Sequence, residues 1–244
     1  MAWARIESAD HLDLHVDPAR PNAADSALAW FRSTGAGAGR SVTVLDTERH
    51  LVDALRRNDY RLRIDAPFFL HCGRALDRLP RRPQLPDGYV CRSVCADETA
   101  ARAAVHRAAW RPAHVGALLV PPVELVGESA MSADRYRAVT ATWPYRRALD
   151  RVVVAPGGTL AAFALAWLDE VNSVGLLEPV GTDPRHARLG LATAVSLAGL
   201  YALRAAGATR AVVCPRGDEQ YPVPRRLYAA LGFRRVARTV TYTA

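Results

Sequence analysis

The segment that most constrains the fold lies at residues 178–193, where an apolar stretch leads through a turn into a long helix. The apolar run from Val174 to Val180 ends in a turn that contains Pro184, and a short basic stretch with one glycine, Gly190, follows. The Ala/Leu-rich residues after it predict a helix over about 189–206. The sequence therefore predicts a strand, a glycine-containing turn and a helix N-terminus in direct succession.

The start of this helix is a predicted anion-binding site. The first N–H groups of a helix have no internal partner, and the helix dipole favours negative charge there. Gly190 has no Cβ, so the backbone can approach a phosphate closely. The loop lacks the G-x-G-x-x-G of dinucleotide-binding proteins and the G-x-x-x-x-G-K-[ST] of nucleotide-triphosphate loops, and the chain has no lysine. We therefore expect a phosphorylated cofactor of another kind.

The loop resembles the pyrophosphate-binding loop of the GNAT-type N-acetyltransferases, [RQ]-x-x-G-x-[GA], which follows a strand and a V-x-P turn. Residues 182–184, Thr-Asp-Pro, occupy the place of V-x-P, and Gly190 and Ala192 match the small positions. Ala187 departs from the family, which has Arg or Gln there. The resemblance implies acetyl-CoA (coenzyme A) as the cofactor, bound by Val180, Gly181, Thr182, His186, Ala187, Arg188, Leu189, Gly190, Leu191, Ala192, Thr193 and Tyr221.

A second match lies at residues 226–233, which resemble the late helix of the same family, a Leu-Tyr pair followed by Leu-Gly-Phe. The apolar residues around Tyr228 recur at helical spacing, and Gly232 suits a helix C-terminus. The family usually has Asn and Ala where this chain has Tyr221 and Pro224.

The two motifs, with a strand predicted between them at 211–214, extend the resemblance over about residues 86–244. It implies the GNAT fold, an α/β (α+β) arrangement in which helices flank both faces of a mixed, mostly antiparallel sheet. Local patterns predict strands at 88–94, 149–155 and 159–168, helices from Asp97 to about Trp110 and over 132–142, and a loop at 111–130.

A proline-dense break after residue 79 indicates the domain organisation. We expect an N-terminal unit at 1–80, a linker at 81–87 and the catalytic GNAT acetyltransferase domain at 88–244. The first unit shares the order helix, strand, helix, strand with the end of the chain, and a glycine-rich turn (Gly35, Gly37, Gly39) follows its first helix.

We therefore interpret the N-terminal unit as a truncated, degenerate copy of the GNAT fold. If Tyr60 aligns with Phe233, Leu55 takes the place of Tyr228, and no phosphate loop precedes it. The unit resembles the inert half of tandem acetyltransferases such as mycothiol synthase. An unrelated α/β structure is the alternative.

Charge leaves two classes of ligand open. The formal net charge is +8 and the pI about 9.8, and every basic residue other than histidine is arginine. Such a chain binds nucleic acid or an anionic small molecule. Because no basic run is interleaved with aromatic residues, and a GC-rich coding sequence also favours Arg and Ala, we expect no nucleic-acid partner.

The four cysteines, Cys72, Cys91, Cys95 and Cys214, form no C-x-x-C pair and no zinc spacing with histidine. We expect reduced thiols in a cytoplasmic protein, and no metal site. The N-terminus lacks a signal-peptide profile, and the longest apolar stretch, 191–203, is too short to cross a bilayer, so we expect no membrane partner.

Glu178 is the predicted general base, because an ammonium must lose a proton before its nitrogen can attack a thioester. Alternation along the strand predicts that Glu178, Val180 and Thr182 share one face. Some polyamine-acetylating members of the family carry a similarly placed Glu. The alternative is a solvated glutamate at a strand interruption, since Pro179 follows it.

Tyr228 is the predicted general acid toward the departing sulfur. Its phenol titrates near pH 10 in water, so it holds its proton at neutral pH. The resemblance places it at the position of the family's acid, and the alternative is a half-buried aromatic residue on an amphipathic helix. A backbone N–H near Val180 or Gly181 would meet the oxyanion.

The predicted substrate pocket combines aromatic and acidic side chains. Aromatic rings can cover a cation, and carboxylates attract an ammonium. Each of these residues has core or solvated surface as its alternative, and Asp169 with Asn172 can instead form a hairpin turn. The residues are Trp110, Trp143, Tyr145, Trp167, Asp169 and Glu170.

These features predict an acetyl-CoA-dependent N-acetyltransferase that acts on a small-molecule amine by direct attack in a ternary complex. A non-catalytic acyl-CoA-binding protein and a basic nucleic-acid-binding protein are the alternatives, and acetylation of a protein amine is a variant within the class. The acyl length and the choice between monomer and homodimer stay open.

Overall fold

The computed structural model describes residues 1–34 and 39–244, so Gly35 and Gly37 of the predicted glycine-rich turn lie outside the described residues. Contacts within the chain divide it into two compact units. The N-terminal unit contains residues 1–71, 216–218 and 235–244. The C-terminal unit contains residues 72–215 and 219–234.

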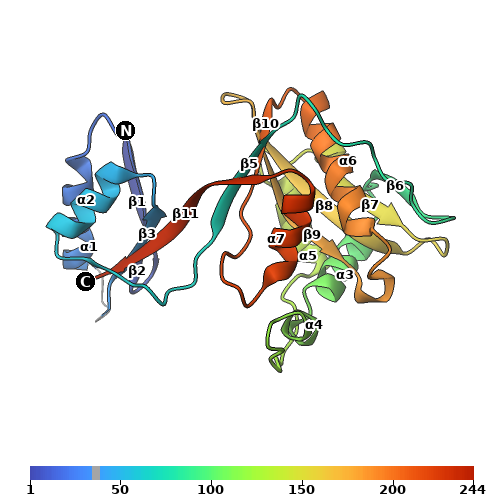
Figure 1. The fold of residues 1–244 in the computed structure, drawn as a ribbon, viewed down its shortest axis with the longest axis horizontal. Helices are drawn as coiled ribbons and strands as arrows, with labels where there is room; N and C mark the ends of the chain where they lie inside the picture. Colours follow the sequence, from blue (N-terminus) through green and yellow to red (C-terminus); the bar gives the residue numbers. More distant parts are fainter. Residues whose placement is uncertain (35–38) are drawn as a thin grey trace. The chain divides into compact units, whose positions relative to one another are not determined.

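The C-terminal unit contains a sheet with the strand order β5-β10-β9-β8-β7-β6 (Figure 1). Neighbouring strands are antiparallel, except that β9 and β10 are parallel. The strands are β5 (Leu70–Ala75), β6 (Val90–Ser93), β7 (Asp150–Val154), β8 (Leu160–Asp169), β9 (Val174–Thr182) and β10 (Arg210–Val213). The helices are α3 (Thr99–Ala109), α4 (Pro112–Ala117), α5 (Ala133–Ala141), α6 (Leu191–Ala205) and α7 (Pro222–Ala230), with 3-10 turns η1 (Arg147–Leu149) and η2 (Pro184–His186).

Helices cover both faces of this sheet. A Cβ added to Gly199 of α6 would lie 3.9 Å from the Cβ of Ala164, so α6 packs closely on the Ala164 face. On the other face, a Cβ added to Gly181 of β9 would lie 2.7 Å from both Ala109 of α3 and Phe163. Residues 163 and 164 are consecutive in β8 and point to opposite faces. The predicted arrangement of a mixed sheet between helices is therefore present.

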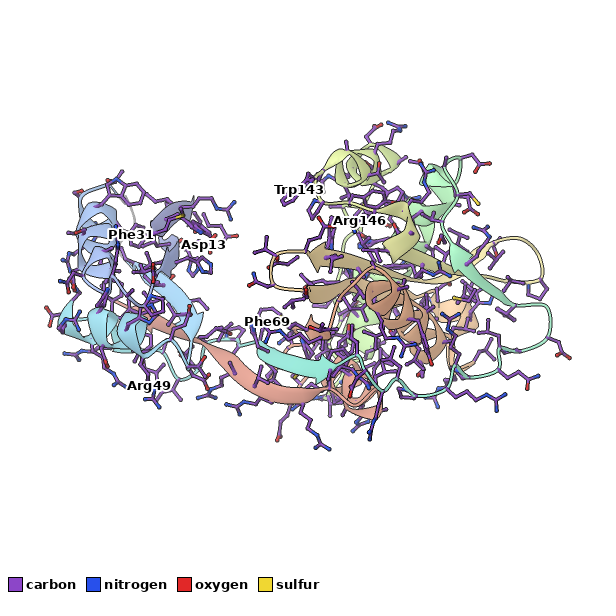
Figure 2. All side chains as sticks on the ribbon, turned by 90° about the horizontal axis from the view of Figure 1, so that it is seen from above. Asp13, Phe31, Arg49, Phe69, Trp143 and Arg146 are labelled. Carbon is purple, nitrogen blue, oxygen red and sulfur yellow. The ribbon has the colours of Figure 1, made fainter. Side chains whose placement is uncertain are left out.

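The N-terminal unit contains a smaller sheet with the order β1-β2-β3-β11, and β4 pairs with β11. Its helices share one core with one face of the sheet, where Phe31 (Figure 2) packs with Leu28 and Leu55. The elements are β1 (Ala2–Ser8), β2 (His11–Val16), α1 (Ala23–Thr34), β3 (Ser41–Leu45), α2 (Arg49–Arg57), β4 (Arg61–Leu62) and β11 (Arg234–Thr243).

The two units repeat one pattern of elements. In the N-terminal unit β1 is antiparallel to β2, α1 leads to β3, which is parallel to β2, and α2 follows. In the C-terminal unit β8, β9, α6, β10 and α7 have the same order and directions. The predicted repeat of helix, strand and helix is present, and an initial strand pair precedes it in both units.

The last strand of each repeat is exchanged. Residues 41–45 of β3 pair with residues 239–243 of β11, from the end of the chain. Residues 210–213 of β10 pair with residues 72–75 of β5, which follows the first repeat. The expected boundaries at 1–80, 81–87 and 88–244 therefore differ from the observed units, because pattern reading assigns each strand to the helix that precedes it in the chain.

Three local expectations need correction. Residues 111–130 are not all loop, since α4 begins with Pro112 in its first turn. Asp97 does not cap α3; Glu98 stands at the N-cap position, and its carboxylate accepts a hydrogen bond from the Cys95 N–H (2.6 Å) and pairs with Arg92. The hairpin of β1 and β2 was missed, although residues 11–16 alternate polar and apolar side chains.

None of the helices in residues 1–34 and 39–244 combines the length and the hydrophobicity that a membrane-spanning helix requires.

Candidate functional site

A cavity of about 290 Å³ lies in the C-terminal unit, on the face of the sheet that α3 covers. Side chains from α3, α5, β8 and β9 and from the segment before α5 form its wall. They are Arg102, His106, Met131, Tyr136, Val139, Leu165, Trp167, Leu176, Glu178 and Pro179.

A β-bulge brings Glu178 into this wall. The pairing of β8 and β9 shifts between Ala164, which faces Val180, and Ala166, which faces Leu177. Residues 178 and 179 therefore lie together opposite Leu165.

The bulge overturns the prediction that Glu178, Val180 and Thr182 share one face. One extra residue inverts the alternation, so Glu178 lines the cavity while Val180 pairs with Ala164 on the α6 side. The Trp167 ring N–H donates a hydrogen bond to the backbone carbonyl of Glu178 (2.8 Å), so this carbonyl has a partner although the regular strand pairing is interrupted there.

Strands β9 and β10 part beyond the bulge. Their parallel pairs join residues 174–176 to residues 210–212, and β9 continues to Thr182. Backbone groups on this side of 178–182 therefore have no partner in β10, which ends at Val213. An extended ligand could pair with such an edge, and the contacts of Val180, Gly181 and Thr182 with the cofactor stay a prediction.

The loop after β9 leads into an open helix start. Gly190 is the N-cap of α6 with φ +73°, and no side chain among the described residues caps it. A Cβ at Gly190 would meet no atom within 4 Å, so the space above its backbone is free. The amides of Leu191, Ala192 and Thr193 belong to the first turn and have no acceptor within the helix.

The loop itself is held by two polar contacts. The buried carboxylate of Asp183 accepts a hydrogen bond from the Arg185 N–H (2.9 Å) and pairs with its guanidinium (2.7 Å). Burial opposes charge on Asp183, but these contacts prevail and lower its pKa. The Tyr89 hydroxyl lies 2.8 Å from His186 Nδ1, which orients that ring.

Glu178, Tyr228 and Cys214 lie close enough to influence one another. Partial burial of the Glu178 carboxylate raises its pKa, although the residue as a whole is solvent-exposed. Tyr228 is only 9% exposed, and burial, followed by the charge of Glu178, raises its pKa well above the usual value. Burial and the same charge raise the pKa of Cys214 to about 11. The two predicted catalytic side chains thus share one region.

The predicted substrate residues divide into two groups. Trp167 lines the cavity. Tyr145 is not part of the wall, but it contacts two wall residues: its ring lies against that of Trp167, and its hydroxyl is 3.3 Å from that of Tyr136. Trp110 stacks on His106 at 6.2 Å between ring centroids, without being part of the wall.

Trp143 and Asp169 lie elsewhere. Trp143 (Figure 2) is 87% exposed. Asp169 accepts hydrogen bonds from the backbone and the side chain of Asn172 (3.0 and 2.6 Å), so it closes the turn between β8 and β9. Residue type alone could not separate a pocket acid from a turn acid.

Sequence reasoning missed the buried polar floor of the cavity. Arg102 forms an ion pair with Asp150 (3.0 Å), and its guanidinium lies 3.9 Å from the centre of the Phe163 ring. The Tyr136 hydroxyl donates to the same carboxylate (2.7 Å). The spacing of Arg102, His106 and Trp110 by four residues was the available signal, since it puts them on one helix face.

The comparisons with known proteins agree with this architecture. No protein-family model matches the chain. Mycothiol acetyltransferase from Kineococcus radiotolerans is 34% identical over 137 residues, which are 56% of this chain and 42% of that protein. The chain therefore aligns with less than half the length of this curated relative.

Two solved structures resemble the whole chain. A GCN5-related N-acetyltransferase from Sphaerobacter thermophilus is 17% identical, with a TM-score of 0.66 that covers 100% of this chain and 75% of that one. A tandem GNAT protein from the clavulanic acid biosynthesis pathway is 19% identical, with a TM-score of 0.67 over 97% of this chain and 75% of its own. The fold is thus the GNAT fold, as predicted.

Proposed function

We propose that the chain is an acetyl-CoA-dependent N-acetyltransferase that transfers an acetyl group to a primary amine of a small molecule. The observation that carries the proposal is the uncapped start of α6, which follows directly on a strand that is bulged at Glu178 and released from β10. A proposed phosphate site, an unpaired strand edge and the proposed base Glu178 thereby lie along one continuous segment, and α7 contributes the proposed acid Tyr228.

Two features of this segment support coenzyme A as the cofactor. The free amides at the start of α6 and the empty space above Gly190 suit a pyrophosphate. The unpaired edge of β9 suits the amide groups of pantetheine. Bound in this way, acetyl-CoA would supply an acetyl thioester, which is the acyl donor.

Glu178 would accept the proton of the incoming ammonium, directly or through a water molecule. A carboxylate whose pKa is raised is a stronger base than an ordinary glutamate, and partial loss of water has this effect on Glu178. Tyr228 would hold its phenolic proton throughout the neutral range and donate it toward the sulfur as the thiol departs.

Direct attack on the thioester needs no acyl-enzyme. Cys214 is the thiol beside the proposed acid and base, but its pKa of about 11 keeps it protonated at neutral pH. A protonated thiol is a poor nucleophile. The amine itself would therefore attack the acetyl group.

Two measurements test the proposal separately. Titration calorimetry with acetyl-CoA should show binding, and absence of binding at millimolar cofactor would reject the whole assignment. Release of free coenzyme A in the presence of a panel of primary amines should then report turnover. Cofactor binding without release against any amine would instead support the non-catalytic alternative.

A further inference from the structure

We infer that the acceptor is a compact, mostly apolar primary amine with an oxygen atom distant from the amine, and that His106 selects it by donating a hydrogen bond to that oxygen. This inference rests on the proposed function, because it takes the cavity beside Glu178 as the acceptor site. It adds the chemical class of the acceptor and names a specificity-determining residue that the motifs do not contain.

The size and wall of the cavity set the class. A volume of about 290 Å³ lies at the lower end of the range for small-molecule sites, roughly 300–1,000 Å³. Much of the wall is apolar or aromatic, formed by Met131, Val139, Leu165, Trp167 and Leu176. A long polyamine or an oligosaccharide would leave its polar groups against this wall without partners, whereas a single ring or a short branched chain would fill it.

Most polar groups in the wall are already engaged. The guanidinium of Arg102 pairs with buried Asp150, and the hydroxyl of Tyr136 donates to the same carboxylate. Two groups remain for a ligand, the carboxylate of Glu178 and the imidazole of His106.

His106 has no polar partner within the described part of the chain. Its ring stacks between Trp110 and Phe163, at 6.2 and 5.4 Å, which fixes the plane of the imidazole. Nδ1 is buried without a hydrogen bond, so Nε2 is the nitrogen left to meet a ligand.

The tautomer follows from the same burial. A buried N–H without an acceptor is rarer than a buried acceptor without a donor. We therefore assign the proton to Nε2, which makes His106 a donor toward the cavity. A hydroxyl, ether or carbonyl oxygen on the acceptor would complete the pair.

The charges around His106 agree with a cationic acceptor. Burial, followed by the charge of Arg102, lowers the pKa of His106 to about 4, so the imidazole is neutral when the amine is an ammonium. Asp150 neutralises Arg102, and Glu178 is the remaining carboxylate among the wall residues. The ammonium therefore goes to Glu178 and the oxygen to His106.

The test compares tyramine with phenethylamine, which differ by one hydroxyl. The wild-type protein should acetylate tyramine with a kcat/KM roughly tenfold higher, expressed mainly in KM. His106→Leu should remove this preference by lowering the value for tyramine alone, and His106→Gln, which keeps an N–H donor, should restore part of it. His114→Leu is the matched control, because His114 lies on α4 outside the wall.

A readout independent of turnover is the NMR signal of the His106 ring. It should shift on titration with tyramine and much less with phenethylamine. Equal loss for both amines in His106→Leu and His106→Gln, or an unchanged preference in folded His106→Leu, would overturn the inference. So would exclusive turnover of spermidine or another polyamine. In these cases acetyl-CoA binding and turnover of some amine would both persist, whereas failure of the proposed function would abolish the binding, the turnover or both.

Discussion

The N-terminal and C-terminal units share one backbone pattern, and the match extends to single hydrogen bonds. The Tyr60 N–H donates to the Leu55 carbonyl and the Phe233 N–H to the Tyr228 carbonyl, both at 3.0 Å. The residue before each donor has a positive φ, 64° at Asp59 and 82° at Gly232. Both helices therefore end in the same type of turn, which agrees with the alignment of Tyr60 with Phe233; the alignment itself stays a prediction. Where the C-terminal unit has a phenol, the N-terminal unit has the aliphatic chain of Leu55.

The helix starts differ in charge. The first turn of α1 contains Asp25, whose carboxylate accepts hydrogen bonds from Asn58 (2.6 Å) and Arg57 (3.1 Å). The first turn of α6 contains no acid and begins at Gly190. A carboxylate beside the free amides repels a phosphate, so of these two helix starts that of α6 is the more favourable for an anion.

The strand pairs differ in where their pairing is irregular. The register of β1 and β2 shifts next to their turn, between Ile6 and Ser8, whereas the shift between β8 and β9 lies opposite Leu165 and contains Glu178. The features of the proposed site are thus present in one unit, and the described residues of the other unit lack them. The difference lies in three local features, the bulge, the uncharged helix start and the phenol.

The largest expected effect on turnover comes from replacing Glu178, the residue in the bulge. Glu178→Gln should lower kcat/KM roughly 100- to 10,000-fold and leave acetyl-CoA affinity unchanged, because only the base is removed. In the wild type, activity should fall as pH falls through the pKa of Glu178, which lies above its usual value. The variant should lose this limb of the pH profile. Glu170→Gln, at an exposed acid paired with Arg146, is the control, and equal turnover in both variants would contradict the assignment.

The phenol is next. Tyr228→Phe should lower kcat roughly 100-fold with little change in cofactor affinity, since it removes the proton donor and keeps the packing against Phe233. Tyr60→Phe makes the same change in the N-terminal unit, where the buried hydroxyl has no partner among the described residues, and should not affect turnover. Steady-state rates of coenzyme A release distinguish the two, and unaltered kcat in Tyr228→Phe would remove its role as acid.

Copying the acid of α1 onto α6 tests the helix start. Asp25 is the third residue of α1 and Thr193 the third of α6, so Thr193→Asp transfers the negative charge. Acetyl-CoA affinity should fall roughly 10- to 100-fold by calorimetry. Thr193→Asn carries the same shape without charge and should bind nearly as the wild type does. The melting temperature of the free protein should not drop, because an acid near a helix N-terminus is favourable.

Two glycines separate backbone strain from ligand contact. Gly190 and Gly158 both have positive φ, 73° and 80°, with no atom within 4 Å of an added Cβ. Replacement by Ala should destabilise each protein by about 1–2 kcal/mol in denaturant unfolding. Only Gly190→Ala should also weaken acetyl-CoA binding, by several-fold. If Gly158→Ala weakened it equally, the loss would reflect general strain.

The smallest effect is expected at Cys214. Cys214→Ala should change turnover by no more than about a factor of two, because a thiol with a pKa of about 11 is not the nucleophile. Mass spectrometry of the wild type incubated with acetyl-CoA alone should show no acetylated Cys214. A stable adduct together with loss of activity in the variant would indicate an acyl-enzyme.

The sequence predicted what depends on neighbouring residues. The glycine turn before α6, the strands β7 and β8, the helix α5 and the helix around Tyr228 are local patterns. It could not predict the bulge, since alternation along β9 gives no information about its register against β8. The prediction that Glu178 shares a face with Val180 and Thr182 was therefore wrong, although Pro179 lies where the regular pairing is interrupted.

The cavity wall needed the tertiary structure. His106 and Tyr136 come from two helices that meet on one face of the sheet, and no motif links them. Trp143 had the right residue type at a solvent-exposed position. The exchange of β5 and β11 escaped detection because single-sequence patterns pair each strand with the elements beside it in the chain.

The exchange of β5 and β11 determines which strand edges a truncation of the chain would expose. Cutting the chain near residue 80 would remove from β10 its antiparallel neighbour β5, although every loop and helix of the proposed site would remain on the other fragment. Deleting the residues after 234 would instead leave β3 with a bare edge, far along the sequence from the deletion. Each repeat therefore has as the neighbour of its last strand a segment that follows the other repeat in the sequence, so either truncation would expose a strand edge among residues that it leaves intact.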